Sequence, residues 1–235
     1  MKKVLQLFSG GKDSFLSSCL LVEQGYEVYL VTYDNGYSLN SKSSISGARR
    51  LVKKYGTEKV KILGVRDISG IWRELIVPYY NSNPSYILKQ YGEIPISQFN
   101  CLTCRISMYI YSIILCQQLG IEYISDGARA DQFFAVEQKE ILNKFNKLLN
   151  EYDIKLLLPV IDLNSDWQRK NELLLRGFVP KTLEPQCLLG VPMNKSLDIK
   201  TIDGIINLYD KYIFEKLETI IDRYKKADLN NGEFF

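Results

Sequence analysis

The stretch that decides the fold is FSGGKDSF, at residues 8–15, which overlaps the end of the apolar, strand-like run KKVLQLF at 2–8. A P-loop requires four residues between its first glycine and a later Gly-Lys-Ser/Thr. Here the two glycines are adjacent and Asp13 follows Lys12. The stretch is therefore a different kind of anion-binding loop, placed between a first strand and the helix that follows it.

The residue types in this loop favour a phosphate or pyrophosphate ligand. Adjacent glycines let backbone N–H groups approach an anion closely, and the following helix presents its N-terminus to the anion. Lys12 adds a full positive charge, and Ser9 and Ser14 add hydroxyl donors. Asp13 would repel a bare phosphate, so its presence indicates a magnesium ion or a capping role for the helix.

The composition is that of a folded soluble protein. Of the 235 residues, 46% are apolar and 24% are charged, which is enough for one domain with an extension or for two small domains. We find no apolar run long enough to span a bilayer, and the run after Lys2 and Lys3 is too short for a signal peptide. We therefore expect a cytoplasmic protein with no membrane partner.

The chain contains no histidine. This excludes Ser-His-Asp and Cys-His catalysis, zinc held by histidine, and imidazole as a general base. Acid–base or metal chemistry must therefore use Asp, Glu, Lys, Tyr or Cys.

Strand-like and helical segments alternate along most of the chain. The strand-like segments are 3–8, 27–33, 59–65, 121–128 and 155–161. Alternation at this short spacing is typical of βαβ units, so it predicts an α/β fold with a parallel sheet. The region 78–100 contains three prolines, and we expect an irregular insertion there.

The C-terminal segment 198–226 predicts a helix with one apolar face. Its apolar residues at helical spacing are Ile202, Ile206, Tyr209, Ile213, Leu217, Ile220 and Tyr224. Such a stripe must be buried on the domain or on a second subunit, so a homodimer through this helix is one expectation. We divide the chain into a domain at 1–180 and an extension at 181–235.

Two of the five cysteines, Cys101 and Cys104, form a C-x-x-C that we expect at the start of a helix over 101–119. At a helix N-terminus the two sulfurs point the same way, and the helix dipole and Arg105 favour thiolates. Cys116 lies about 18 Å along that helix from Cys104, which is too far to share a metal ion.

Cys187 stands in the loop PQCLLG, near Pro185 and Pro192. A loop at this point can fold back over the strand ends, where Cys101 and Cys104 are expected. Three such cysteines can hold an iron–sulfur cluster with one open iron, hold zinc with a fourth ligand, carry out thiol–persulfide chemistry, or be reduced structural thiols. The lack of a well-placed fourth cysteine disfavours zinc.

FSGGKDSF resembles the PP-loop of the ATP pyrophosphatases, the adenine nucleotide alpha hydrolase-like enzymes. These enzymes cleave ATP between its α and β phosphates, adenylate a substrate and release pyrophosphate. The resemblance covers roughly residues 1–180 and implies a doubly wound, five-stranded parallel sheet. It also implies a set of residues that cradle the leaving pyrophosphate: Ser9, Gly10, Gly11, Lys12, Asp13 and Ser14.

The same resemblance implies further nucleotide contacts. The residues expected to face the adenosine are Thr32, Tyr33 and Asp34, at the end of the second strand. The segment SDGARADQ, at 125–132, resembles the family segment that places a glycine and an acidic residue near the phosphates and magnesium. Gly127 and Asp131 match it, whereas Ala128 stands where the family often has histidine. The implied cofactors are ATP and magnesium, and the implied catalytic residues are Lys12, Asp13 and Asp131.

A PP-loop combined with a C-x-x-C and a later third cysteine resembles the tRNA 2-thiolation enzymes of this superfamily. By that resemblance, Cys101, Cys104 and Cys187 would hold a 4Fe–4S cluster whose free iron carries the sulfide that attacks an adenylated tRNA base. Sister enzymes use a nucleophilic and a persulfide-bearing cysteine instead. The implied activity is an ATP-dependent tRNA sulfurtransferase, with tRNA and a sulfur donor or carrier as partners.

Two other interpretations remain open. One is a small-molecule ligase resembling 7-cyano-7-deazaguanine synthase, although that family carries a compact zinc site of four cysteines. The other is a non-catalytic adenine-nucleotide-binding subunit of a modification complex. We see no additional RNA-binding domain, so tRNA contacts would have to come from the C-terminal helix, from a partner, or from a basic cluster that otherwise faces solvent: Arg49, Arg50, Lys53 and Lys54.

Overall fold

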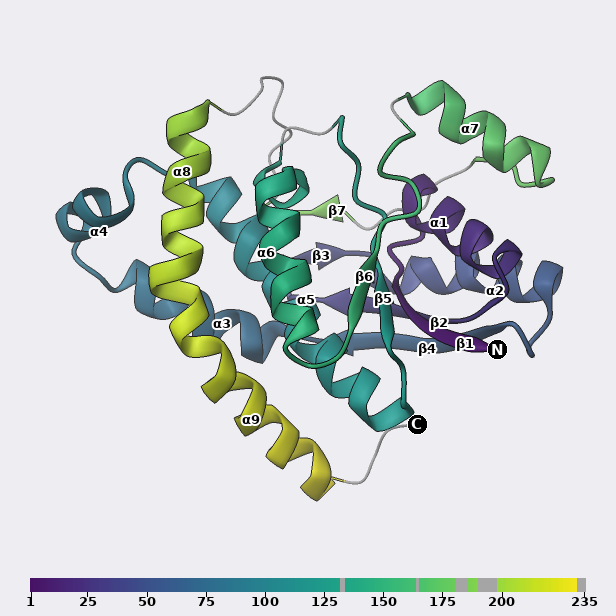
Figure 1. Ribbon diagram of the computed structural model, residues 1–235, viewed down its shortest axis with the longest axis horizontal. Coiled ribbons are helices and arrows are strands. Elements are labelled where there is room, and N and C mark those ends of the chain that lie inside the picture. Colours follow the sequence, from purple (N-terminus) through teal and green to yellow (C-terminus); the bar gives the residue numbers. More distant parts are fainter. Residues whose placement is uncertain (132–133, 164, 181–185, 190–197, 232–235) are drawn as a thin grey trace.

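The computed structural model describes residues 1–131, 134–163, 165–180, 186–189 and 198–231. At its centre is a five-stranded sheet in which every pair of neighbours is parallel, in the order β4-β2-β1-β5-β6 (Figure 1). Its strands are β1 Lys2–Leu7, β2 Tyr26–Asp34, β4 Val60–Asp67, β5 Tyr123–Ser125 and β6 Lys155–Leu157. All five predicted strands are present, but the last two are shorter than predicted.

Helices cover both faces of this sheet, as the doubly wound prediction requires (Figure 1). The helices of one layer are α1 Lys12–Glu23, α2 Ser44–Tyr55 and α7 Asp166–Leu175; those of the other are α3 Ser69–Tyr80, α5 Ile96–Leu119 and α6 Lys139–Asn150. Alternate residues of β1 enter the two cores, Val4 on the α1 side and Leu5 on the α5 side. Because helices cover both faces of β1, its apolar residues are not confined to alternate positions.

The strand order reverses between β1 and β5. In open α/β sheets, ligands bind beyond the carboxyl ends of the strands at such a switch point. The loop after β1 is the glycine-rich stretch 8–11, and the loop after β5 begins at Asp126. The fold therefore brings together the two segments that the sequence singled out.

The region predicted as an irregular insertion is mostly helical. Helix α3 continues to Tyr80, α4 occupies Pro84–Tyr91, and α5 begins at Ile96, immediately after Pro95. By length and composition α5 could cross a membrane, which differs from our expectation that no run is long enough. However, 72% of its apolar window is buried inside the protein, so α5 serves as the central helix of one core.

The C-terminal helices pack against the chain itself. They are α8 Ile199–Leu208 and α9 Phe214–Asn231, joined by a π-helical turn, Tyr209–Ile213. Their buried apolar residues are Ile205, Leu208, Tyr209, Tyr212, Ile213, Leu217, Ile220 and Ile221. Ile205 is fully buried, and its predicted neighbour Ile206 is partly buried against the same core. Burial on the same chain removes the reason for expecting a dimer through this stripe.

Candidate active site

The glycine-rich loop is preorganised by its own side chains. Ser9 Oγ accepts a hydrogen bond from the Gly11 N–H at 3.1 Å and lies 3.1 Å from Ser14 Oγ. Gly10 has φ +80, and a Cβ there would lie 3.1 Å from the Ser44 Cα. The loop thus needs glycine at position 10 both for its left-handed backbone and for the close approach of α2.

The loop after β5 lies directly against the first turn of α1. A Cβ on Gly127 would lie 2.8 Å from the Ser14 backbone nitrogen and 3.1 Å from the Asp13 carbonyl carbon. Only glycine permits this approach. The structure therefore brings Gly127 to the glycine-rich loop, as predicted, while its contact with phosphate stays a prediction.

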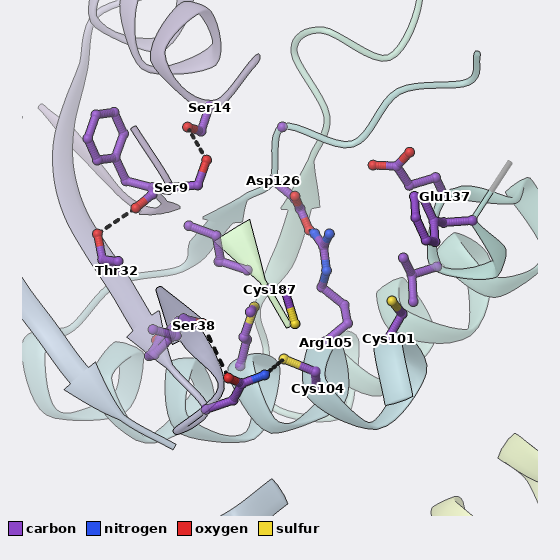
Figure 2. Close-up of a pocket in the computed structure, with 18 of the residues that line it drawn as sticks. Ser9, Ser14, Thr32, Ser38, Cys101, Cys104, Arg105, Asp126, Glu137 and Cys187 are labelled. Carbon is purple, nitrogen blue, oxygen red and sulfur yellow. Dashed lines mark hydrogen bonds and ion pairs between the residues drawn. The ribbon is translucent and has the colours of Figure 1, made fainter. Parts of the chain in front are cut away.

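A cavity of about 370 Å³ opens beside these loops (Figure 2). The predicted site residues that line it are Ser9, Asp13, Ser14, Thr32, Tyr33, Cys101, Cys104, Gly127 and Cys187. Thr32 Oγ1 donates a hydrogen bond to the Phe8 carbonyl oxygen, which joins the ends of β1 and β2 at the cavity wall (Figure 2). The cavity therefore extends from the glycine-rich loop to the cysteines.

Five predicted residues lie outside this wall: Gly10, Gly11, Lys12, Asp34 and Asp131. The Asp34 carboxylate accepts hydrogen bonds from the Gly36 N–H at 2.8 Å and from Ser41 Oγ at 2.6 Å, so it holds its own loop. Its neighbour Asn35 lines the cavity instead, and sequence reasoning missed it. Lys12 forms an ion pair with Asp166, the first residue of α7.

Asp13 and Asp131 are held by two arginines that the sequence analysis did not identify. Arg129 lies 3.4 Å from Asp13 and 3.5 Å from Asp131. Arg169, from α7, lies 2.9 Å from Asp13 and 3.3 Å from Asp131. Burial raises the pKa of Asp13 above its ordinary value, and the two guanidinium groups oppose that rise.

Cys101 and Cys104 lie one to two turns inside α5 rather than at its start. The prediction of thiolates favoured by a helix N-terminus is therefore wrong: α5 begins five residues earlier, at Ile96. Burial raises the pKa of Cys101 to about 11 and that of Cys104 to about 12. Arg105 does not reverse this, because its guanidinium forms an ion pair with Asp126.

Cys187 reaches the same cavity through a small second sheet. Strand β7, Gln186–Cys187, pairs antiparallel with β3, Ser38–Leu39, so that Cys187 lies opposite Ser38. Cys101, Cys104 and Cys187 all line this cavity (Figure 2). The expected return of Cys187 over the strand ends is confirmed, whereas Pro185 and Pro192 lie outside the described residues.

The three cysteines share the cavity without forming a preassembled metal site. In the part of the chain that the structure describes, no group of three His, Cys, Asp or Glu side chains is arranged to hold a metal ion. The Cys104 sulfur instead accepts a hydrogen bond from the Asn35 amide at 3.3 Å. The described cysteines therefore form no preassembled cluster site, and their ligation of a 4Fe–4S cluster stays a prediction.

A second polar group lines the same cavity, and sequence reasoning missed it. Asp126 forms an ion pair with Arg105 and accepts a hydrogen bond from the Tyr109 hydroxyl at 2.9 Å. Glu137, from a 3₁₀ turn before α6, lines the same wall. Burial raises the pKa of Glu137 to about 8, so its carboxyl group is largely protonated at neutral pH.

Part of the basic cluster on α2 has a structural role. The Arg50 guanidinium lies 5.5 Å from the ring centroid of Phe178, and Lys54 Nζ lies 4.8 Å from the same centroid. These cation–π contacts attach α2 to the segment after α7. The presence of Arg50 and Lys54, two of the four basic residues, is therefore explained by contacts within the protein, with no need for a nucleic-acid partner.

A family model described as "Queuosine biosynthesis protein QueC" matches residues 3–176. A tRNA-specific 2-thiouridylase MnmA 2 from Fusobacterium nucleatum is 28% identical over 146 residues, which is 62% of this chain and 38% of that protein. A 7-cyano-7-deazaguanine synthase from Acetivibrio thermocellus is 23% identical over 177 residues, which is 70% of this chain and 74% of that protein.

Among solved structures, a 4-thiouridine synthetase–RNA complex with bound ATP has the same fold, with a TM-score of 0.62 at 13% identity. The match covers 96% of this chain and 54% of that one. At this identity the likeness concerns the fold alone. The chain spans well under half the length of the thiouridylase relative, so that relative's activity does not transfer directly. The family match, in contrast, extends over most of the chain and includes the glycine-rich loop, both arginines and the C-x-x-C. The chain therefore belongs to the QueC family, within the PP-loop ATP pyrophosphatase superfamily.

Proposed function

We propose that this protein adenylates an oxygen atom of a small purine-like substrate and releases pyrophosphate, in a reaction of the 7-cyano-7-deazaguanine synthase type. The observation that carries this proposal is that one cavity is lined both by Ser9 of the glycine-rich loop and by Arg105, Asp126 and Glu137. Membership of the QueC family and the deazaguanine synthase relatives support the same class of substrate.

The chemistry requires an activated leaving group. A carboxyl or carbonyl oxygen is a poor leaving group until AMP is attached to it, after which ammonia or another nucleophile can displace AMP. The glycine-rich loop supplies backbone N–H groups, the Ser9 and Ser14 hydroxyls, and the start of α1 for the departing pyrophosphate. Fixing ATP and acceptor in one cavity supplies the proximity that the reaction needs.

The part of the cavity lined by Arg105, Asp126 and Glu137 suits a flat heterocycle. Apolar contact is available from Trp72, Phe134 and Val136, which line the cavity. The protonated Glu137 carboxyl can donate a hydrogen bond to a ring carbonyl or ring nitrogen, and Asp126 can accept one from a ring N–H. Such a mixture of apolar surface and few polar groups is typical of small-molecule sites.

Magnesium fits the carboxylates near the loop. Mg²⁺ is usually bound by one or two carboxylates together with substrate phosphates, and Asp13 and Asp131 are two carboxylates that share both of their arginine partners. Bound there with ATP, the ion would neutralise charge on the phosphates. The chain's own contribution is to keep the two carboxylates close together.

A second candidate is sulfur insertion into a tRNA base, which we predicted from the cysteines. The observation that favours it is that Cys101, Cys104 and Cys187 all line the cavity that would hold the adenylated substrate. Because the described cysteines do not form a cluster site, this candidate is best supported in its persulfide form.

The two candidates are separated by their acceptors. The protein is incubated with ATP, Mg²⁺ and ammonia plus either a 7-deazaguanine carboxylic acid or unmodified tRNA with a persulfide sulfur donor and a thiol reductant, and AMP and pyrophosphate are measured. The proposal predicts substrate-dependent pyrophosphate release with the acid. Pyrophosphate release that depends only on tRNA would favour sulfur insertion. If neither acceptor stimulates pyrophosphate release, both candidates are contradicted.

A further inference from the structure

Four charged side chains beside the glycine-rich loop form a closed ring. Asp13 lies on α1, Arg129 and Asp131 lie on the loop after β5, and Arg169 lies on α7. Asp13 Oδ1 lies 2.9 Å from Arg169 Nε, and Asp13 Oδ2 lies 3.4 Å from Arg129 Nε. Asp131 Oδ1 lies 3.5 Å from Arg129 Nε, and Asp131 Oδ2 lies 3.3 Å from Arg169 Nη1. Each of the four carboxylate oxygens therefore faces one arginine.

The two arginines of this ring are held differently. The Arg169 side chain is only 1% exposed, and its Nη1 also donates a hydrogen bond to the Leu163 carbonyl oxygen. The Arg129 side chain is 16% exposed, it comes from a loop, and both of its carboxylate contacts are longer than the Arg169–Asp13 contact. Exchanging Arg129 for another partner should therefore cost less free energy than exchanging Arg169. The oxygens that face Arg129 are Asp13 Oδ2 and Asp131 Oδ1.

We propose that Arg129 holds the place of the divalent cation in the nucleotide-free protein. When ATP and the cation bind, the cation replaces the guanidinium between Asp13 and Asp131, and Arg129 transfers to the phosphates. Arg169 keeps its carboxylate contacts throughout and is a positioning residue for the pair. The inference rests on the proposed use of ATP at this loop and adds how the cation and the nucleotide depend on each other.

The charge balance favours this exchange only when both ligands arrive. With Arg129 in place the ring has no net charge, so a free divalent cation gains little by entering it. The phosphates offer the displaced guanidinium a new partner with which it forms strong, charge-assisted hydrogen bonds. Cation and nucleotide should therefore increase each other's affinity by the same factor, because coupling between binding sites is reciprocal.

A matched control is available on the same helix pair. Arg176, just after α7, forms ion pairs with Glu23 on α1 at 2.7 Å and with Glu172 at 2.6 Å. It connects α1 to α7 as Arg169 does, but at the other end of α1, away from the glycine-rich loop. Replacing Arg176 tests the cost of losing a connecting ion pair alone.

The experiment titrates Mn²⁺, followed by electron paramagnetic resonance, with and without a non-hydrolysable α,β-methylene ATP. Wild-type protein and Arg176→Met should bind Mn²⁺ weakly alone and about tenfold more tightly with the analogue. Arg129→Met should bind Mn²⁺ alone about tenfold more tightly than wild type, with most of the coupling lost. Arg169→Met should bind Mn²⁺ more weakly in both conditions.

The result that would overturn the inference is an Arg129→Met protein whose nucleotide-free Mn²⁺ affinity equals that of wild type. If Arg129→Met fails to fold, Arg129→Lys replaces it: the charge is kept, the bridging fork is lost, and a smaller gain in Mn²⁺ affinity is expected. An unchanged affinity in that variant counts equally against the inference. Coupled binding of Mn²⁺ and analogue in a protein that releases no pyrophosphate would contradict the proposed function and leave this inference standing.

Discussion

Lys12, the first residue of α1 after the glycine-rich loop, forms an ion pair with Asp166, the first residue of α7. The two residues are 154 positions apart in the chain, and Asp166 also contacts Lys170 at 2.6 Å. The lysine expected to bind pyrophosphate is thus paired with a carboxylate of α7. Nucleotide binding must compete with Asp166 for this cation.

Replacing Asp166 with Asn should therefore strengthen ATP binding. A partly exposed ion pair contributes about 0.2–1 kcal/mol, so the dissociation constant for ATP should fall by roughly 1.5- to 5-fold. Isothermal titration calorimetry measures the change, with Asp162→Asn as the control because Asp162 is exposed and lies outside α7. Weaker ATP binding in Asp166→Asn would mean that Asp166 supports the bound state instead.

Gly127→Ala should abolish most activity while leaving the fold intact. The added Cβ would lie 2.8 Å from the Ser14 nitrogen, so the loop after β5 or the start of α1 must move. A displacement of this kind can lower the rate on the order of 100-fold. Pyrophosphate release and thermal unfolding are measured together.

The control for that variant is Gly47→Ala, in which the added Cβ would meet the Phe8 ring at 3.4 Å, an ordinary contact. Gly47 lies on α2 and also faces the glycine-rich loop. Near wild-type pyrophosphate release by Gly127→Ala would show that the close approach of the two loops is not required.

Glu137 should make stability depend on pH. Its pKa is raised to about 8 in the folded protein from an ordinary 4.5. The folded state therefore keeps a proton at pH values at which the unfolded state has already lost it. The stabilisation is complete below about pH 4.5 and is lost as the pH rises through 8, at about 1.4 kcal/mol for each pKa unit.

Denaturant unfolding at intervals from pH 5 to 9 tests this dependence. The free energy of unfolding of wild type should fall across the range, and Glu137→Gln, which keeps a neutral side chain of the same shape, should show a flatter profile. Parallel profiles for the two proteins would place the titrating group elsewhere.

The cysteines should differ in reactivity. Cys187 is exposed, whereas burial raises the pKa of Cys101 to about 11 and of Cys104 to about 12. Because the thiolate is the reactive form, iodoacetamide at pH 8 should modify Cys187 well before the other two. Mass spectrometry of peptides gives the order, and early labelling of Cys104 would contradict the described burial.

The metal prediction for the cysteines has its own measurement. Anaerobically purified protein is analysed for iron, zinc and labile sulfide. A colourless protein without iron or sulfide would remove the 4Fe–4S prediction, whereas a stoichiometric cluster would require the three cysteines to come closer together than the described arrangement places them. We predict that Cys187→Ser retains adenylation. The variant should lose the final product only if the reaction is sulfur transfer.

Local signals in the sequence were enough to predict the sheet and the glycine-rich loop. These signals can be read within short segments of the chain. They are the apolar runs of buried strands, the glycines of turns and the alternation of helical and strand-like segments. The start of α5 was missed because its first residues, from Ile96 to Asn100, lie in the proline-containing region that we took as an insertion. The thiolate prediction for Cys101 and Cys104 failed with it.

The charged partners of the loop could not be predicted in the same way. Arg169 and Asp166 belong to an otherwise ordinary amphipathic helix, and their contacts with Asp13 and Lys12 depend on how α7 packs on α1. Such pairing between distant segments leaves no spacing pattern in the sequence. Arg129 lies within the SDGARADQ segment, but nothing in that segment indicates that its side chain joins two aspartates.

In the proposed reaction, ATP is cleaved between its α and β phosphates while AMP is attached to a substrate oxygen. The most direct measurement uses a 7-deazaguanine carboxylic acid carrying oxygen-18 in its carboxyl group, with ATP, Mg²⁺ and ammonia, and determines the mass of the AMP released. We expect AMP and pyrophosphate in equal amounts, with one labelled oxygen in the AMP phosphate. Formation of ADP and phosphate, or of AMP without the label, would contradict it.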